Sequence, residues 1–446
     1  MALTGLEIYK HLPKTNCKDC GFPTCLAFAM KMAAKQVSLD KCPHVTPAAK
    51  AALEAAARPP IQLVTIGADA QELKIGNETQ LYRHEEKFYR PTLVAVRVWD
   101  TLEPAAASAS LEAIAGLSFE RVGTKVSVDL VAVDNASGDA GRFESLARQA
   151  VEVTGRPAVL LSAKAENLQR AARALAGKRP LLYISDPQQA LAAAAVAKAE
   201  NCPLAVRADG LEDLAALTPK IEAAGVEQIV IDPGVRGLKA TLEALTRIRR
   251  AALKNFRPFG YPTIAFTSAA SAMLQVIEAS TYVAKYASIV VTDLVERWQL
   301  LPVLATRQDV FTDPQKPVAV QPKLYTVGEV GADSPVLVTT NFSLTYYSVE
   351  GEVEASRVPA YILSVDTEGT SVLTAWASDK FNAGTITKAL KASGIEQRVS
   401  HRKLILPGLV SVLSAGVEDE SGWAAQVGPK EASGIPSYLK NQWKSN

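Results

Sequence analysis

The chain has 446 residues, of which 48% are hydrophobic and 21% charged, a balance that is ordinary for a globular protein. Its 48 Lys and Arg nearly match its 46 Asp and Glu, so the formal net charge is +2 and the basic footprint of a nucleic-acid-binding protein is excluded. The length predicts two to four domains. The sequence shows neither a secretory signal nor an apolar run long enough to span a membrane, so we expect a cytoplasmic protein.

A cysteine cluster near the N-terminus is the most distinctive stretch. Cys17, Cys20, Cys25 and Cys42 follow the spacing C-x2-C-x4-C-x16-C, and only one further cysteine is present. A disulfide framework is a poor explanation, because a chain of this length can build its own core. Structural zinc sites favour two close pairs, whereas one pair with a third and a distant fourth cysteine is more typical of iron–sulfur ligation. We therefore favour a [4Fe–4S] cluster on these four thiolates, with zinc as the alternative.

A small module of three helices is expected around these cysteines, at residues 1–58. The second helix would begin at the third cysteine, so that backbone N–H groups lie near the sulfur atoms and favour negative charge there. The third would begin at Thr46-Pro47, an N-cap followed by proline at the first helical position. The expected ranges are 3–12, 25–33 and 46–57, and the run Arg58-Pro59-Pro60 then marks a boundary.

Residues 59–320 alternate short apolar runs with helical patterns. Strands that are apolar throughout are typical of a parallel sheet buried on both faces. Eight such strands are expected after an entry segment and a hairpin-like stretch, at 92–98, 126–133, 158–161, 181–184, 204–206, 228–231, 263–266 and 288–291. Helices follow most of them, for example at 167–176, 187–199, 211–223 and 238–251. This number and size predict a (β/α)8 TIM barrel, with a doubly wound open sheet as the alternative.

Function in such a barrel would sit where the strands end at their carboxyl termini. Polar residues follow the predicted strands at these positions: Asp134, Asn135, Ser162, Ser185, Asp186, Arg207, Asp209, Asp232, Thr267 and Asp293. Asp and Ser there commonly cap the next helix, and we prefer that explanation to a small-molecule site. Cys202, at a strand start, is expected to be a buried structural thiol.

A proline-containing stretch at 307–331 is expected to be a linker. Its part near 310–330 is the candidate hinge about which the C-terminal domain would move. It leads into a small α/β, Rossmann-like domain at 321–446. The expected strands are 336–340, a hairpin of 344–349 and 352–355 turning at Glu350-Gly351, then 360–365, 403–406 and 423–427. The expected helices are 371–376, 383–393, 409–415 and 437–442.

Loops rich in hydroxyls and glycine follow the strands of this domain. They contain Thr340-Asn341, the run from Gly369 to Thr374, Gly408, and Ser433-Gly434. Such loops converge beyond the carboxyl edge of an open parallel sheet, where ligands bind. The domain contains neither a G-x-x-x-x-G-K-[ST] nor a G-x-G-x-x-G motif, and the chain contains no G-x-S-x-G elbow, which argues against ordinary nucleotide sites and hydrolytic chemistry.

Taken together, these features resemble the large (gamma) subunit of the corrinoid iron–sulfur protein of the reductive acetyl-CoA (Wood–Ljungdahl) pathway. The resemblance covers the whole chain, and its most specific part is Leu12-Pro13-Lys14-Thr15-Asn16-Cys17 through to Cys25. It implies a corrinoid methyl carrier, in the methyltransferase class but not a conventional enzyme. Cobalt as Co(I) would accept a methyl group from methyltetrahydrofolate and deliver it to acetyl-CoA synthase, while the [4Fe–4S] cluster would support reductive reactivation of Co(II).

The resemblance also implies a set of cofactor contacts and partners. A cobalamin-type corrinoid would lie against Thr340, Asn341, Gly369, Thr370, Ser371, Val372, Leu373, Thr374, Gly408, Ser433 and Gly434. No histidine stands in a D-x-H-x-x-G motif, so we expect a base-off corrinoid without a protein His ligand, and Thr374 as a non-ligating neighbour below the ring. The implied partners are a small subunit forming a heterodimer, the methyltetrahydrofolate methyltransferase, CO dehydrogenase/acetyl-CoA synthase and a low-potential electron donor.

Two other classes of function stay open on the sequence alone. One is an iron–sulfur electron-transfer subunit whose α/β domains only dock partners. The other is a barrel methyltransferase that uses a pterin at Asp134 and Asp232, with the cysteine module as an accessory.

Overall fold

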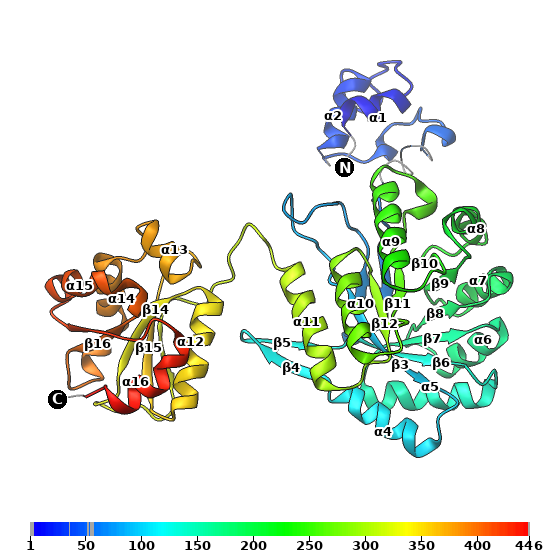
Figure 1. The fold of residues 1–446 in the computed structure, drawn as a ribbon. Coiled ribbons are helices and arrows are strands. Elements are labelled where there is room, and N and C mark those ends of the chain that lie inside the picture. Colours follow the sequence, from blue (N-terminus) through cyan, green and yellow to red (C-terminus); the bar gives the residue numbers. More distant parts are fainter. Residues whose placement is uncertain (1–3, 35, 51–52, 54–57, 445–446) are drawn as a thin grey trace. The chain divides into compact units, whose positions relative to one another are not determined.

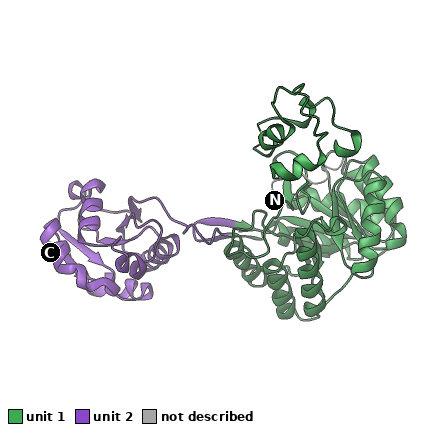
Figure 2. Ribbon diagram, turned by 90° about the horizontal axis from the view of Figure 1, so that it is seen from above, with its two compact units in different colours: residues 1–119, 126–311 green, residues 120–125, 312–446 purple. Residues whose placement is uncertain are grey.

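The computed structural model describes residues 4–34, 36–50, 53 and 58–444. The chain divides into two compact units, residues 1–119 with 126–311 and residues 120–125 with 312–446 (Figure 2). The finer division into three domains, with boundaries at 58 and 320, stays a prediction. In the described part of the chain, no helix is both long enough and apolar enough to cross a membrane.

The N-terminal module is built on two helices, α1 (Gly5–His11) and α2 (Cys25–Ala33), as expected. A capping box starts α1, because Thr4 Oγ1 accepts a hydrogen bond from Glu7 N and the Glu7 carboxylate accepts one from Thr4 N. Thr46 caps a further helical turn by accepting from Ala49 N at 3.1 Å. Half of that third expected helix, at 51–52 and 54–57, lies outside the described residues.

Eight parallel strands form a nearly closed barrel in the first unit (Figure 1). They are ordered β10-β9-β8-β7-β6-β3-β12-β11, and a parallel bridge between Ile231 and Thr263 links the two ends. The strands are β3 (Leu93–Trp99), β6 (Leu130–Asp134), β7 (Ala158–Ser162), β8 (Leu181–Ile184), β9 (Leu204–Arg207), β10 (Ile229–Asp232), β11 (Ile264–Phe266) and β12 (Ile289–Thr292). The prediction of a barrel is confirmed. The alternative, a doubly wound open sheet, does not agree with this nearly closed ring of strands.

Each barrel strand is followed along the chain by a helix. The helices are α4 (Pro104–Ala115), α5 (Ala140–Thr154), α6 (Ala165–Ala174), α7 (Ala190–Ala199), α8 (Leu211–Ala223), α9 (Leu238–Leu253), α10 (Ala272–Ala284) and α11 (Arg297–Phe311). The last of these corrects the predicted start of the linker, because α11 continues through residues 307–311. Its buried Leu300, Val303 and Leu304 pack in the same core as the barrel strands, which keeps the helix intact despite Pro302.

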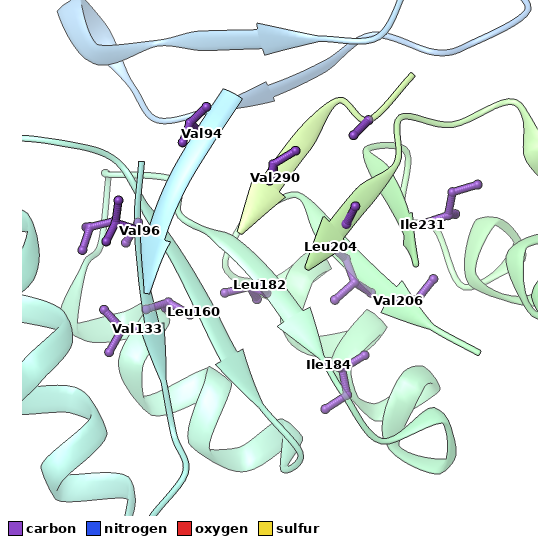
Figure 3. Close-up of a cluster of buried hydrophobic side chains, with 14 of the residues drawn as sticks. Val94, Val96, Val133, Leu160, Leu182, Ile184, Leu204, Val206, Ile231 and Val290 are labelled. Atoms are coloured by element: carbon purple, nitrogen blue, oxygen red, sulfur yellow. The ribbon is translucent and has the colours of Figure 1, made fainter. Parts of the chain in front are cut away.

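Alternation along the strands builds two apolar layers. Leu93 and Ala95 of β3 face the barrel interior, whereas Val94 and Val96 face the surrounding helices. Figure 3 shows part of this outer layer. The hairpin of β1 (Val64–Ile66) and β2 (Leu73–Ile75) supplies further side chains to the interior core.

The expected strand at 126–133 is wrong as a single element. It is divided between β5 (Thr124–Ser127), which pairs with β4 (Ser118–Arg121) in a separate hairpin, and β6. Asp129 lies at the break, where its carboxylate accepts from Val94 N and pairs with Arg307. A carboxylate held in this way ends one strand and anchors the next to the barrel.

The C-terminal unit is a five-stranded sheet with helices on both faces. The strand order is β13-β15-β14-β16-β17, with β13 antiparallel and the other four parallel. The strands are β13 (Leu324–Val327), β14 (Val336–Thr340), β15 (Ala360–Val365), β16 (Lys403–Leu406) and β17 (Ala424–Val427). The helices are α12 (Ser343–Ser356), α13 (Val372–Ala377), α14 (Ala383–Ser393), α15 (Ser414–Ser421) and α16 (Ile435–Asn441). Strand β13 lies within the predicted linker, which is a second correction there.

The predicted hairpin at 344–355 is also wrong, because these residues form helix α12. Strands β14 and β15 are parallel neighbours, and a connection between parallel neighbours needs a crossover, usually a helix. Tyr346 and Val353, two helical turns apart, are buried on the face of the helix that meets the sheet. Gly351, taken as a turn residue, lies inside the helix.

Candidate metal and cofactor sites

The cysteine loop is folded back on itself by its backbone. Lys14, Asn16 and Lys18 have φ values of 61°, 49° and 70°, and Gly21 has 83°, so several residues adopt the left-handed conformation. Gly21 N donates to Lys18 O at 2.8 Å, which closes a tight turn around Cys20. Asn16 Oδ1 accepts from Cys25 N at 2.9 Å and so ties the loop to the start of α2.

The third cysteine occupies the first position of α2, as the sequence predicted. Thr24 is the N-cap and its hydroxyl accepts from Ala27 N at 3.0 Å. The helix N-terminus stabilises negative charge, which suits a thiolate ligand. Cys25 is buried, Cys20 and Cys42 are half-buried, and Cys17 is exposed.

The tightest group of potential ligands in the described residues is Cys17, Asp19 and His44, whose ligand atoms lie within 4.8 Å of one another. Four thiolates around one zinc ion, at about 2.3 Å from it, would bring their sulfur atoms within about 4 Å. No three of the four cysteine sulfurs form so tight a group among the described residues.

Asp19 and His44 were missed by sequence reasoning. His44 Nε2 lies 2.6 Å from Asp19 Oδ2, and hydrogen bonds to His44 and then to Cys17 hold the pKa of the Asp19 carboxyl below its usual value. Their closeness to the second and fourth cysteines in sequence was the available signal. The pair links the two cysteine-bearing segments.

A largely apolar cavity of about 440 Å³ lies at the carboxyl edge of the C-terminal sheet. Its wall comes from loops after β15, β16 and β17, together with residues of α12. Ser371, Val372 and Leu373 are the predicted residues that line it directly. The other predicted residues of this unit do not line it, although most belong to the same loops. Thr339, Pro407 and Leu409, which belong to the loops that the sequence placed at this edge, also line it, whereas sequence reasoning missed Leu337, Leu344, Ile405, Pro429 and Lys430.

Asn341 organises the loop that leads to the cavity. Its Oδ1 accepts from Thr367 N at 2.9 Å, Thr367 Oγ1 at 3.0 Å and Gly369 N at 3.0 Å. Its Nδ2 donates to Asp366 Oδ1 at 3.1 Å. The side chain is buried, so the predicted cofactor residue Asn341 acts here by positioning the segment before Ser371.

Gly408 and Gly428 let two loops cross at the cavity. A Cβ on Gly408 would lie 2.5 Å from Gly428 O and 2.8 Å from Lys430 N, both backbone atoms. A Cβ on Gly428 would lie 2.8 Å from Ile405 Cγ2. Only glycine therefore permits this close approach, and Gly408, a predicted site residue, is needed for the shape of the cavity wall.

Buried hydroxyls without a hydrogen-bond partner lie near the carboxyl ends of β14 and β15. Among the described residues they include Thr339 Oγ1, Thr340 Oγ1 and Ser364 Oγ. Thr339 and Ser364 are register partners on β14 and β15, and Thr339 lines the cavity. Buried polar atoms are almost always partnered, so the unpartnered Thr339 hydroxyl at the cavity wall is one of the exceptions among the described residues.

Large apolar side chains on the same loops and helices are exposed. Leu344, Leu373, Trp376, Leu409 and Val412 are between 42% and 70% exposed. Leu344, Leu373 and Leu409 also line the cavity. An exposed apolar rim of this kind is typical of a surface that binds a ligand or a partner.

The only histidine of the C-terminal unit lies away from these loops. His401 precedes β16, at the amino end of the parallel strands, and it is buried. Its Nε2 contacts Ser334 O at 2.9 Å, and its Nδ1 accepts from Lys403 N at 3.2 Å. Both ring nitrogens are engaged in holding the sheet.

The polar ring of the barrel is largely internally paired. Arg97 binds Asp293 at 2.8 and 2.9 Å and reaches Asp134 at 3.4 Å. Asp232 accepts from Tyr183 Oη at 2.7 Å and from Arg236, and burial raises the pKa of Tyr183 well above its usual value. Asn135, Ser162 and Asp186 hold neighbouring loops, Asp186 by accepting from Gln188 N. The capping role that the sequence favoured holds for Asp186, whereas Asp134, Asp232 and Asp293 pair with arginine or tyrosine side chains instead.

Comparisons with known proteins cover nearly the whole chain. The family model for the CO dehydrogenase/acetyl-CoA synthase delta subunit matches residues 63–439, and a model for a proposed Fe-S cluster matches residues 12–44. The corrinoid/iron-sulfur protein large subunit of Moorella thermoacetica is 47% identical over 99% of both chains. The acetyl-CoA decarbonylase/synthase complex subunit gamma of Methanothermobacter thermautotrophicus is 35% identical over 98% of this chain and 99% of that protein.

Among solved structures, dihydropteroate synthase from Thermus thermophilus matches 56% of this chain with a TM-score of 0.40. The match includes all of the synthase chain, and the sequence identity is 14%. This likeness is too low to carry an argument about function.

Proposed function

The chain belongs to the family of corrinoid/iron-sulfur protein large subunits and acetyl-CoA decarbonylase/synthase gamma subunits, and on this premise we propose that it is a corrinoid methyl carrier with its own [4Fe–4S] cluster. The observation that carries the proposal is the 440 Å³ cavity at the carboxyl edge of the C-terminal sheet. Its apolar wall, unpartnered hydroxyls and crossing glycines match what a bulky, amide-rich macrocycle with an appended base would need.

The chain's residues would divide the work of binding a corrinoid. Ser371, Val372 and Leu373 would contact it from the wall, Thr339 would donate to its amide groups, and Asn341 and Gly408 would hold the loops in place. When bound, the corrinoid supplies a cobalt able to accept a methyl group from methyltetrahydrofolate, through a methyltransferase, and to release it to acetyl-CoA synthase. The remaining predicted contacts, Thr340, Gly369, Thr370, Thr374, Ser433 and Gly434, stay proposals.

We further propose that the corrinoid is bound base-off with no protein histidine as lower ligand. The position of His401 at the opposite end of the strands, with both nitrogens engaged, supports this. Thr374 is exposed in α13, and its hydroxyl accepts a hydrogen bond from Ser371 Oγ at 3.1 Å. A threonine hydroxyl below the corrinoid ring would be only a weak ligand to cobalt. Fewer and weaker axial ligands make the metal easier to reduce.

The base-off proposal is tested by electron paramagnetic resonance of the Co(II) protein. We expect no nitrogen hyperfine splitting from a lower axial ligand, both in the wild type and in a His401→Gln variant. A nitrogen splitting that disappears in His401→Gln would contradict the proposal directly.

The four cysteines would hold the [4Fe–4S] cluster, and the cluster would reduce Co(II) back to Co(I) after accidental oxidation. On this proposal Cys17, Cys20, Cys25 and Cys42 are the ligands. The proposed partners are a small subunit in a heterodimer, the methyltetrahydrofolate methyltransferase, CO dehydrogenase/acetyl-CoA synthase and a low-potential electron donor. A cytoplasmic location is part of the same proposal.

A further inference from the structure

A second cavity of the C-terminal unit lies between helix α14 and the strand pair of β13 and β15, and its volume is about 650 Å³. Among the described residues, it shares no lining residue with the cavity that we propose for the corrinoid. Volumes of about 300–1,000 Å³ are typical of small-molecule sites. The second cavity is therefore large enough for a ligand of its own.

Three basic side chains line this cavity. They are Lys323, next to the start of β13, Lys388 on α14, and Arg398, beyond the end of α14. Asp366 is the only carboxylate among the described lining residues. Residues 312–446 as a whole carry 12 basic and 14 acidic side chains, a formal charge of −2. Positive charge is therefore concentrated at this cavity in an otherwise slightly acidic unit, and we call the cavity the basic groove.

The protein does not neutralise these basic side chains. Lys388 and Arg398 are exposed, and in the part of the chain that the structure describes their side chains form no hydrogen bond and no ion pair. Lys323 Nζ lies 4.8 Å over the ring of Tyr325 and has no carboxylate partner in that same part. Like charges along one cavity repel one another, so an anion that binds among them is favoured.

The one carboxylate of the basic groove is engaged by its own loop. Asp366 Oδ1 accepts from Asn341 Nδ2 at 3.1 Å and from Glu368 N at 3.0 Å. Among the described residues it forms no ion pair with the basic side chains of the groove. With three positive side chains and one negative side chain, the groove keeps a surplus of two positive charges.

Apolar side chains complete the wall of the basic groove. Leu324 and Ala389 are half-buried and Ala392 is exposed. Ala392 lies four residues after Lys388, so both are on the face of α14 that lines the groove. An apolar wall beside a few charged groups is the usual composition of a site for a small organic molecule.

We propose that the basic groove binds a small organic phosphate. The phosphate group would lie among Lys323, Lys388 and Arg398, and the apolar body of the ligand would lie against Leu324 and Ala389. A phosphate monoester carries about 1.5–2 negative charges at pH 7, which matches a surplus of two positive charges better than the single charge of a carboxylate does. The Arg398 guanidinium supplies parallel donors that suit phosphate oxygens.

The competing explanation is that these are solvated surface charges without a ligand. Variants of the groove separate the two explanations, because the Lys388 and Arg398 side chains have no partner among the described residues that a substitution would leave unpaired. Replacing them should leave the fold intact, so a loss of ligand binding would report on the site itself.

The test uses the full protein, with any subunit that accompanies it, as wild type, as Lys388→Gln/Arg398→Gln and as Lys316→Gln/Lys440→Gln. The last variant is the matched control, because it removes two exposed lysines of the same unit that line neither cavity. Phenyl phosphate is the probe, and inorganic phosphate and phenol are its two separate parts. Calorimetry measures affinity and stoichiometry with and without bound cobalamin, and thermal unfolding checks the fold of each variant.

We expect one phenyl phosphate per chain, with an affinity that is unchanged in the control and at least about tenfold lower in Lys388→Gln/Arg398→Gln, because two charge-assisted contacts are lost. Inorganic phosphate should bind more weakly than phenyl phosphate, and phenol should not bind.

The absence of saturable phenyl phosphate binding to the wild type overturns the proposal, and so does an equal affinity in Lys388→Gln/Arg398→Gln. Equal affinities for inorganic phosphate and phenyl phosphate would refute the role of the apolar wall. The affinity should not depend on cobalamin, because the two cavities have separate linings. A wild type that binds phenyl phosphate but no cobalamin would refute the proposed function and leave this site standing.

Discussion

At the residue scale, the site depends on side chains that act on the backbone as well as on those that face the cavity. Asn341 is the clearest case. The sequence predicted it as a cofactor contact from its place at a strand end, and its four hydrogen bonds instead fix the turn from Asp366 to Gly369. No periodicity encodes such a role, because it depends on where a distant loop returns to the sheet.

Asn341→Ala should therefore lower both stability and corrinoid retention. It leaves the N–H groups of Thr367 and Gly369 without their acceptor, at a cost of about 1–3 kcal/mol. The control is Asn382→Ala, which removes the N-cap of α14 at a cost of about 1 kcal/mol and does not line the cavity. Thermal unfolding and gel filtration with bound corrinoid check both. Equal corrinoid loss in the two variants would show that Asn341 affects corrinoid binding only through the stability of the fold and has no specific role at the cavity.

Cys202 is predicted to be a structural thiol, unlike the four proposed ligand cysteines, and its chemical reactivity tests this prediction. Burial raises the pKa of its thiol to about 12. At pH 8 the thiolate fraction is then about one in ten thousand, so the native protein should resist iodoacetamide at Cys202 while the unfolded protein reacts. Because the folded pKa lies above the unfolded one, the stability that this thiol contributes is complete below about pH 9 and is lost as the pH rises toward 12. Mass spectrometry showing rapid native labelling of Cys202 would contradict the assignment.

At the scale of elements, local sequence signals were enough to predict a helix or strand wherever the segment is capped or uniformly apolar. Seven of the eight barrel strands were predicted as apolar runs, and the helix at Cys25 was predicted at the place where Thr24 caps it in the structure. Helix α12 was missed because two Tyr, two Val and one Thr give parts of its sequence the local preference of a strand, and Gly351 indicated a turn between them. The parallel pairing of β14 with β15, a tertiary fact, requires the helix there.

The crossing of Gly408 and Gly428 gives a prediction at this scale. Gly408→Ala places a Cβ against backbone atoms that cannot move aside, so the cavity wall should shift and corrinoid retention should fall at least tenfold. Gly351→Ala is the matched control, because nothing lies within 4 Å of its Cβ and it is inside α12. That variant should instead gain about 0.5–1 kcal/mol in unfolding free energy with unchanged corrinoid binding. Normal corrinoid retention in Gly408→Ala, by gel filtration, would show that the crossing is not part of the site.

At the scale of the whole molecule, the cysteine module, the barrel and the C-terminal unit each carry a different kind of residue group. The cysteine module carries four clustered cysteines, the barrel is an internally paired scaffold, and the C-terminal unit holds a largely apolar cavity. The sequence predicted this division from the cysteine spacing and the strand count. It could not give the full cavity lining, since residues such as Leu337, Ile405 and Lys430 come together only when the sheet is assembled.

The central claim, a cluster and a corrinoid on one chain, is tested most directly by the cofactor content of the full protein. It would be purified without oxygen together with any subunit that accompanies it, supplied with iron, sulfide and cobalamin, and passed through gel filtration. We predict about four iron atoms and one corrinoid per chain in the protein peak, with the iron lost in a Cys20→Ala variant that keeps its corrinoid. Iron retained by the wild type while all corrinoid elutes separately would contradict the account and leave an electron-transfer subunit as the better description.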